Sequence, residues 1–443
     1  MEDIHNLVGH FLKQQGYQDT FEQLEKDYGR AIKPQVLPFT HEDLVTIVND
    51  KLEYDQLNNN LTLFSLDRND HIKHTPELMN IIELQMINWS IPYPNKPKLL
   101  LELLNNPLSC TRNEYVNHLY ITTTKSELIV YDLDKNTQFI HKLKSIIKKI
   151  VFINQNQMIM ISIDGKFISA NVSQDDISYV NQIQVHKRLI IDVKSVVIDN
   201  IHYIVSIGWD NMVKIYKINN NGDKNDEYFE FCQQHELNNT CASFDITYYQ
   251  NQIFIIIGKN YITLLDVLIF NLKTSNLTLG YQISINDAEF SSIGFSPRYI
   301  TIQNNGNQTI PLIAIATSHE PEMRVIITSL NQYDSQIVKE NQFKIYRLQI
   351  LKNLNSENPQ NSLSKPFINW RLAKNHKSQG IWVMSDDGYV RTIDLINHEV
   401  EKLSYHKGSL KECITYDNEG EVLITCGSDK KVVIWQNNNI INN

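Results

Sequence analysis

The hydrophobic positions at the start of the chain repeat with the period of an α-helix. They follow the spacing i, i+3, i+4, i+7, i+8, which places them along one face: Ile4, Leu7, Val8, Phe11 and Leu12. The acidic residues Glu2 and Asp3 suit the N-terminal end of a helix dipole. Gly16 can take the left-handed conformation that ends a helix. The pattern therefore predicts a short amphipathic helix that ends near Gly16.

A second short helix is predicted directly after the first. It is expected to begin near Asp19, where Glu22 could complete a capping box. Two helices of this length cannot bury so much apolar surface by themselves. We therefore expect residues 1–30 to pair with a second copy as a four-helix dimer, or to pack as a hairpin on the rest of the chain. The residues expected on the inner face and at the corner are Tyr17, Thr20, Phe21 and Leu24.

The next residues are expected to extend the helical part and then to form a linker. Residues 31–57 contain a predicted helix, His41–Leu57, because apolar side chains fall on one side of it: Leu44, Ile47, Val48 and Leu52. Residues 58–76 are polar and rich in asparagine, which is typical of a linker.

From residue 77 onward, pairs of short apolar strands joined by tight turns recur about every 40–50 residues, which is typical of a β-propeller. The C-terminal repeat contains predicted strands at Leu410–Tyr416, Glu421–Cys426 and Val432–Trp435. With it, the count predicts a mainly β chain of seven blades. The six earlier pairs are His118–Thr124 with Glu127–Leu133, Met158–Ile163 with Lys166–Ala170, Tyr203–Ile207 with Val213–Ile218, Gln252–Gly258 with Tyr261–Val267, Leu312–Thr317 with Met323–Ser329, and Gly380–Met384 with Tyr389–Leu395.

Two of the repeats carry the same set of polar side chains at matching places. In order along the last repeat, these are His406, Thr425, Asp429 and Trp435. The third repeat has tyrosine in place of tryptophan, and its set is His186, Ser206, Asp210 and Tyr216. Buried polar groups stabilise a fold when each of them has a hydrogen-bond partner. We therefore expect both sets to be structural.

The repeats resemble those of the WD-repeat family, in which one repeat makes one blade and such polar sets are hydrogen-bonded. The N-terminal pattern, with its Gly16-Tyr17 corner, is similar to the LisH (lissencephaly-homology) motif, which dimerises in its family. The resemblances imply a seven-bladed WD-repeat β-propeller over residues 77–443, preceded by a small all-α LisH unit over residues 1–30. Dimerisation would then use Ile4, Leu7, Val8, Phe11, Leu12, Tyr17, Phe21 and Leu24.

The last repeat ends soon after its tryptophan and lacks an outer strand. We expect the apolar stretch Ile81–Ile87 to supply this strand and close the ring, since closure removes an exposed sheet edge. Two further stretches, Asn304–Thr309 and Asn353–Ser364, are expected to be loop insertions in the fifth and sixth repeats.

Composition narrows the class of function. The net charge of −9 argues against broad binding to nucleic-acid phosphates, and no apolar run reaches the roughly 20 residues of a membrane span. Five scattered cysteines and an acidic N-terminus are typical of an intracellular protein, cytoplasmic or nuclear. The densest basic cluster is expected to be a solvated strand edge, or else a weak anion site: Lys142, Lys144, Lys148 and Lys149.

Sequence signals for catalysis are absent. The chain has no phosphate-binding glycine loop, no His-Glu-x-x-His motif and no Gly-x-Ser-x-Gly elbow. The pair His71 and His74 is expected to lie in a solvated loop, and Asp386 with Asp387 in a turn. We therefore expect a non-enzymatic protein without cofactor or metal. The alternative is an enzyme or small-ligand binder with its site in the central channel.

The WD resemblance also indicates a binding face. In that family the turns between second and third strands share one side of the disc with the loops that enter each blade. Tryptophan and arginine are enriched among residues that dominate affinity, so Trp209 with Arg188 is the preferred contact patch. The alternative is that Trp209 packs between blades. The residues expected on this partner-binding face are Lys187, Arg188, Trp209, Asp386, Lys407 and Ser428.

The leading hypothesis is a protein–protein interaction adaptor that forms a LisH homodimer and presents a propeller face to proteins or peptides. Such pairing raises apparent affinity by about 10²–10⁴ without new contacts. The same order of domains resembles lissencephaly-type dynein regulators, transducin-beta-like corepressor subunits and LisH/CTLH-type ubiquitin ligase subunits. A substrate-recruiting ligase subunit and a transcriptional corepressor subunit are therefore more specific alternatives.

Overall fold

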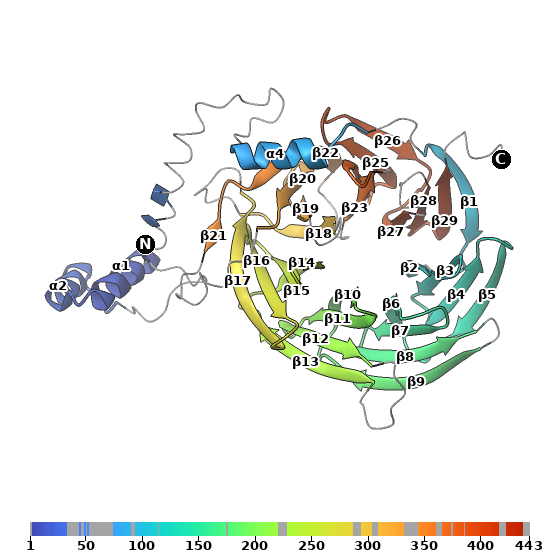
Figure 1. Cartoon of the computed structure of the whole chain (residues 1–443), viewed down its shortest axis with the longest axis horizontal. Helices are drawn as coiled ribbons and strands as arrows, with labels where there is room; N and C mark the ends of the chain where they lie inside the picture. Colours follow the sequence, from blue (N-terminus) through green and yellow to red (C-terminus); the bar gives the residue numbers. More distant parts are fainter. Residues whose placement is uncertain are drawn as a thin grey trace.

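Seven β-sheets stand around a central axis as a closed ring, the blades of a β-propeller (Figure 1). The prediction of a mainly β chain with seven blades and a helical N-terminus is thereby confirmed. This is a computed structural model, and it describes residues 2–32, 44–45, 48–49, 51–52, 74–89, 94–113, 115–173, 176–219, 228–286, 294–303, 309–331, 344–359, 366–373, 375–384, 386–415 and 422–436.

Each of the first three blades has four antiparallel strands, ordered from the channel outward. Blade 1 contains β2 (Pro107–Asn113), β3 (His118–Thr123), β4 (Glu127–Asp132) and β5 (Thr137–Lys142). Blade 2 contains β6 (Ile147–Phe152), β7 (Gln157–Ser162), β8 (Lys166–Val172) and β9 (Ile177–Gln184). Blade 3 contains β10 (Ile190–Ile198), β11 (Ile201–Gly208), β12 (Met212–Ile218) and β13 (Phe229–Glu236).

The next three blades follow the same plan, with one addition. Blade 4 contains β14 (Cys241–Tyr249), β15 (Gln252–Lys259), β16 (Leu264–Asn271), β17 (Asn276–Ser284) and the parallel strand β21 (Ile345–Tyr346). Blade 5 contains β18 (Pro297–Gln303), β19 (Leu312–Thr317), β20 (Glu322–Ser329) and β22 (Ile350–Pro359). Blade 6 contains β23 (Phe367–Leu372), β24 (Ser378–Met384), β25 (Tyr389–Asp394) and β26 (Val400–Ser404).

Blade 7 closes the ring with strands from both parts of the chain. It contains β27 (Leu410–Thr415), β28 (Leu423–Gly427) and β29 (Lys431–Gln436), with β1 (Lys96–Glu102) antiparallel to β29. The prediction that Ile81–Ile87 would close the ring is wrong, because most of this stretch belongs to helix α4 (Pro76–Gln85). The Thr75 hydroxyl caps that helix and proline occupies its first turn, so the local signals favour a helix.

The hydrophobic core lies between neighbouring blades. One cluster, for example, joins Leu119 and Ile121 of blade 1 to Ile424 and Val432 of blade 7. The middle strands are covered on both sides, so their sequences are nearly continuous apolar runs, as in Ile253–Ile257. Each blade is therefore held in place by apolar packing against its two neighbours.

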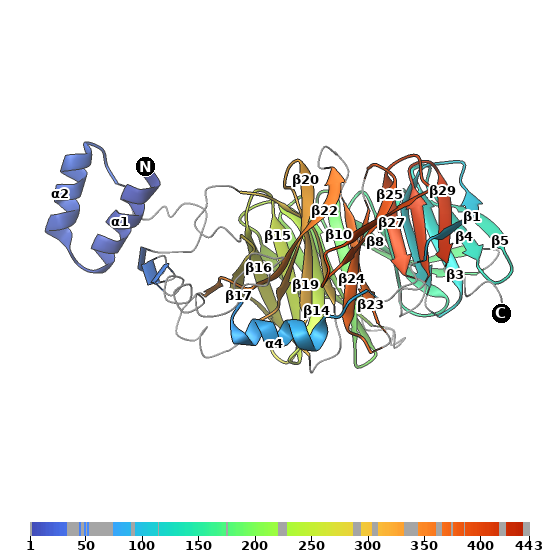
Figure 2. The same cartoon turned by 90° about the horizontal axis from the view of Figure 1, so that it is seen from above.

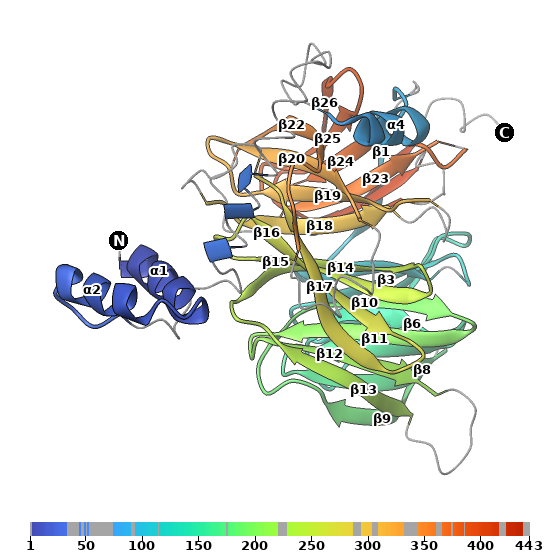
Figure 3. The ribbon, with the colours of Figure 1, turned by 60° about the vertical axis from the view of Figure 1, so that its left-hand side comes forward.

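A segment that we call the latch (residues 74–89) packs along one side of the ring (Figure 2). Leu78, Ile82 and Met86 enter the apolar cluster between blades 5 and 6, where Figure 3 shows α4 against the sheets. Trp89 then enters the cluster between blades 6 and 7, edge-on to Trp382. The latch thus ties three blades together before the chain reaches β1.

The N-terminal hairpin consists of α1 (Glu2–Gln14) and α2 (Gln18–Tyr28), as the hydrophobic pattern predicts. Its buried side chains are Leu12, Phe21 and Ile32. Gly9 is needed here, since a Cβ at this position would lie 2.6 Å from Ile32 Cγ2. Most of the predicted helix His41–Leu57 and most of the predicted linker lie outside the described residues.

The predicted insertion Asn353–Ser364 is wrong for its first half, because residues 353–359 belong to β22. Polar side chains are buried in this strand, and Asn358 accepts a hydrogen bond of 3.1 Å from Arg391. A strand with buried polar partners has no apolar signal to reveal it. The rest of that stretch, and most of Asn304–Thr309, lies outside the described residues.

Candidate protein-binding face

The loops that enter the blades and the turns between second and third strands share one side of the ring, because successive strands alternate in direction. We call this side the upper face. Among the described residues, backbone hydrogen bonds join the entry loop to the turn in blades 1 to 5 and in blade 7. Within blade 3, for example, Trp209 N donates to Leu189 O at 2.9 Å and Leu237 N donates to Asn211 O at 2.8 Å. In the described part of the upper face, these bonds fix the loops to the turns.

In blade 7 the expected polar set holds a turn of the upper face. His406 Nδ1 lies 2.9 Å from Asp429 Oδ1, and His406 Nε2 lies 2.8 Å from Thr425 Oγ1. Trp435 Nε1 donates to the same Thr425 Oγ1 at 2.8 Å. The chain of bonds links the loop, two strands and the turn of one blade.

Blade 3 has the same arrangement, with one difference. His186 lies 2.9 Å from Asp210 Oδ1 and 2.8 Å from Ser206 Oγ. Tyr216 packs its ring against Phe167 and Phe231 at the place that tryptophan takes in blade 7. The tyrosine ring fills the space between blades, so aromatic packing replaces the hydrogen bond that tryptophan makes in blade 7.

Burial lowers the pKa of both histidines, against the hydrogen bond to the aspartate that acts to raise it. Burial also acts to raise the pKa of Asp210 and Asp429. The hydrogen bonds that these carboxylates accept outweigh burial, so both aspartate pKa values are lowered. Both sets are therefore fixed in one state near neutral pH, as suits a structural role.

The residues expected to bind partners fall into three places. Trp209 and Arg188 lie together in blade 3, both exposed, and Trp209 is 58% exposed rather than packed between blades. Lys407 and Ser428 lie in blade 7, where Lys407 is exposed but Ser428 is half-buried over Gly408. Asp386 is half-buried in blade 6 and lies close enough to Arg298 to affect its pKa. The blade 3 pair is therefore the more accessible patch.

Exposed apolar side chains follow one another around the upper face of blades 1 to 4. They are Leu104 at 81% exposed, Ile163 at 38%, Trp209 at 58% and Tyr261 at 82%. Sequence reasoning missed Tyr261, because tyrosine favours strands and was assigned to one. It lies instead in the turn before β16, with a φ of 58°. Each of these four blades thus presents one exposed apolar side chain on the same side of the ring.

A second group of residues that sequence reasoning missed lines the central channel. Lys149 Nζ lies 3.0 Å from Asp192 Oδ1, and Lys194 Nζ lies 3.2 Å from Asp245 Oδ1. Glu412 Oε2 accepts a hydrogen bond of 2.6 Å from Cys110 N. Each side chain reaches the inner strand of the next blade, so these polar groups satisfy strand edges that would otherwise be unpaired.

This arrangement also corrects the expected role of the basic cluster. Lys148 and Lys149 lie on β6 and donate to backbone oxygens of blade 3, including a bond of 2.7 Å from Lys149 to Val193 O. They are not a solvated strand edge, because β6 is an inner strand. The available signal was that polar residues recur at the same place in the first strand of several repeats. Sequence reasoning compared only the second and third strands.

The channel contains a cavity of about 410 Å³ between the inner strands of blades 1 to 3. Arg112, Lys149, Lys194 and His202 contribute polar groups to its wall. Burial lowers the pKa of His202, against a backbone hydrogen bond with Ile153. The volume lies within the roughly 300–1,000 Å³ that is typical of small-molecule sites.

Within the described ranges, no group of three or more His, Cys, Asp and Glu side chains is placed to hold a metal ion. The prediction that His71 and His74 lie in a solvated loop is wrong for His74, and His71 lies outside the described residues. His74 is buried, and its Nε2 lies 2.9 Å from Leu351 O in blade 5. Among all the residues that the structure describes, no helix has the length and apolar character to cross a membrane.

The ring and its upper face define a β-propeller, which at a coarse level is the fold of a protein-interaction scaffold. The chain belongs to the family described as UCP007778, beta-propeller domain, which it matches over residues 66–436. It is similar to "Uncharacterized protein YGR117C" of Saccharomyces cerevisiae, at 24% identity over 88% of this chain and 87% of that protein. A shorter similarity is to "Probable cytosolic iron-sulfur protein assembly protein 1" of Kluyveromyces lactis, at 33% identity over 16% of this chain and 22% of that protein.

Proposed function

We propose that this chain is a non-enzymatic adaptor, paired through its N-terminal hairpin, that presents the upper face of its propeller to partner proteins. The observation that carries this proposal is the exposure of Trp209 beside Arg188 within a series of exposed apolar groups. Aromatic and arginine side chains of this kind dominate the affinity of many interfaces. The resemblance to WD repeats supports the choice of this face.

Pairing is supported by the small size of the hairpin's own core. Among the described residues, its hydrophobic cluster contains only members of the segment 2–32, and Ile4 is 62% exposed. Leu7 lies on the same stripe but outside that cluster. A second copy could cover both side chains, as the resemblance to LisH implies.

The test is affinity capture with the full chain, a form that lacks residues 1–30, and the double variant Trp209→Ala with Arg188→Ala. We expect the double variant to lose at least one partner while its melting temperature is unchanged. Phe231→Ala, an exposed aromatic on the outer strand of the same blade, is the matched control. An unchanged list of partners would remove the blade 3 patch, and absence of any partner for the full chain would remove the adaptor role.

The partners captured would also distinguish the more specific roles. Ligase components favour a substrate-recruiting ubiquitin ligase subunit, and chromatin proteins favour a corepressor subunit. Partners that depend on residues 1–30 would be those that require pairing, because two linked sites raise apparent affinity.

The channel cavity favours a second candidate function, the binding of a small anionic molecule. Arg112, Lys149 and Lys194 contribute cationic groups to its wall, and Asp192 and Asp245 offset the charges of the two lysines. Inorganic phosphate and nucleotides can be used as probes in thermal-shift measurements. A stabilisation that is lost in Lys194→Met, but kept in the blade 3 double variant, would favour this alternative.

A further inference from the structure

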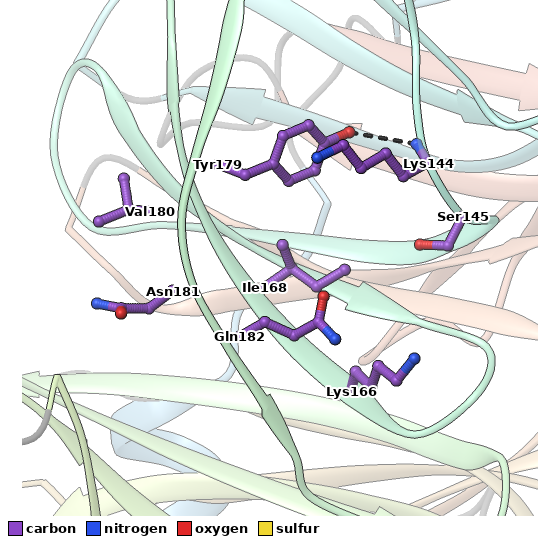
Figure 4. Close-up of a pocket in the computed structure, with 8 residues that line it drawn as sticks. All are labelled: Lys144, Ser145, Lys166, Ile168, Tyr179, Val180, Asn181 and Gln182. Carbon is purple, nitrogen blue, oxygen red and sulfur yellow. Dashed lines mark hydrogen bonds between the residues drawn. The ribbon is translucent and has the colours of Figure 1, made fainter.

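A pocket lies where blades 1 and 2 meet, at the edge of the upper face (Figure 4). It has a volume of about 250 Å³, and we call it the seam pocket. Lys144 comes from the loop between the blades, Lys166 and Ile168 from β8, and Tyr179 and Val180 from β9. Figure 4 shows Ile168 between the Tyr179–Lys144 pair and Lys166. The pocket therefore has two cationic ends and an apolar middle.

We propose that the seam pocket binds a short acidic segment of a partner protein. A carboxylate of that segment would lie near the two lysines, and a neighbouring apolar side chain would pack on Ile168 and Val180. This inference rests on the proposed adaptor function and names the chemistry of one partner. In this proposal, the strongest contact of the partner is made in the seam pocket, which lies beside the blade 3 patch.

The lysines are held in position but are not equally neutralised. Lys144 N donates to Tyr179 Oη at 3.2 Å, and Lys144 Nζ lies 4.3 Å from the centre of the Tyr179 ring. Lys166 Nζ pairs with Asp164 Oδ2 at 2.7 Å. Among the described residues, no carboxylate lies within ion-pairing distance of Lys144. Lys144 is therefore the lysine that can form an ion pair with a ligand carboxylate.

The surface next to the pocket has the same character. The turn that follows Asp164 touches the loop before blade 3, since a Cβ on Gly165 would lie 2.8 Å from Arg188 O. Lys187 and Arg188 are exposed on that loop. Ile163 and Trp209 flank it as exposed apolar groups. Cationic and apolar groups thus alternate from the seam pocket to the blade 3 patch.

Charge complementarity selects an acidic protein segment. The chain as a whole carries −9, so a local group of cations is a feature of this place and not of the whole surface. Complementary charge raises association rates and excludes wrong partners. The pocket is smaller than the roughly 300 Å³ at which typical small-molecule sites begin, and its apolar wall fits a side chain.

The experiment is selection of random short peptides on the full chain, followed by affinity measurements on the selected sequences. We expect enrichment of aspartate or glutamate next to leucine, isoleucine or phenylalanine. Lys144→Glu with Lys166→Glu should weaken binding of these peptides by at least about tenfold. Lys142→Glu is the matched control, because this lysine is exposed on β5 but does not line the pocket. Affinity should also fall as salt is raised, because the attraction is screened.

Enrichment of basic or uncharged peptides, no enrichment, or equal binding to the double variant would overturn the proposal. Failure here is separable from failure of the adaptor role. If the full chain captures partners that the seam-pocket variant also captures, the adaptor function stands and the pocket is not its anchor. If the full chain captures none, the adaptor function itself fails.

Discussion

The hairpin and the latch are two helical segments that precede the first strand of the ring, and they differ in what they pack against. The latch packs into two clusters between blades, and Gln85 Nε2 donates to Ile310 O of blade 5 at 3.1 Å. The cluster of the hairpin, as far as the chain is described, contains only residues of the segment 2–32. The first is therefore a part of the propeller fold, whereas the second retains apolar surface that can serve association. Similar amphipathic patterns thus lead to different roles.

The largest effect is expected from Trp89→Ala in the latch. Trp89 is 5% exposed and packs between blades 6 and 7. Removal of such a buried ring costs about 3–5 kcal/mol, which denaturant unfolding would measure as a lower free energy of unfolding. Leu84→Ala is the control, since Leu84 is on the same segment but 60% exposed. Equal, small losses for both variants would show that the latch is not part of the cooperative fold.

A matched pair of glycine substitutions sharpens the comparison. A Cβ on Gly380 would lie 2.0 Å from Trp89 Cε3 and 2.5 Å from Ile393 O, with no space to move. We expect Gly380→Ala to cost about 1–3 kcal/mol by overpacking. Gly9→Ala meets Ile32 in the hairpin instead, and it should leave the melting temperature of the propeller unchanged. A shift of that temperature by Gly9→Ala would mean that the two segments are coupled.

The sequence was informative where the signals were local. The spacing of His406, Thr425, Asp429 and Trp435 lies within one repeat, and the structure joins them by hydrogen bonds. Ring closure was not local, because β1 pairs with β29 of the last repeat. β1 contains the apolar run Leu99-Leu100-Leu101, but its first residues, Lys96-Pro97-Lys98, are typical of an edge strand. Nothing within this segment indicates which strand it pairs with.

The channel residues and the seam pocket could not be predicted from the sequence, for two different reasons. Glu412 is near Lys149 and Lys194 in space, but each comes from a different blade. Lys166 and Tyr179 lie on the adjacent strands β8 and β9 of blade 2, and Lys144 lies on the loop that enters this blade. The sequence does not reveal the register of β8 with β9 that places these side chains together. Only the closed ring makes the channel residues neighbours.

The seam between blades 7 and 1 differs from the latch because it contains an ionisable group. Burial raises the pKa of Glu412 to about 7, although the hydrogen bond from Cys110 N and the nearby Lys149 act to lower it. The ordinary value is 4.5, so the folded state binds this proton more tightly than the unfolded chain. The stabilisation is complete below the ordinary value and is lost as pH rises through the folded value.

Glu412→Gln removes this titration while an amide oxygen can still accept from Cys110. Melting temperatures of both proteins should be measured from about pH 5 to about pH 8. We expect the wild type to lose stability relative to the variant over this range. A difference in melting temperature that stays constant over this range would show that the pKa of Glu412 is not raised.

The smallest effect on the propeller, and the sharpest test of the hairpin, is expected from Leu7→Glu. Leu7 lies outside the hairpin's own cluster, so a charge there should leave the hairpin folded but prevent a second copy from covering the stripe. Light scattering at micromolar concentration should give a dimer for the wild type and for Gln14→Glu, an exposed control on the same helix, but a monomer for Leu7→Glu. The free energy of unfolding of the propeller should change by less than about 0.5 kcal/mol. A monomeric wild type would contradict pairing, and a dimeric Leu7→Glu would move the contact to another surface. Because the latch variants act on stability and this one acts on mass, the two helical segments can be assigned their roles independently.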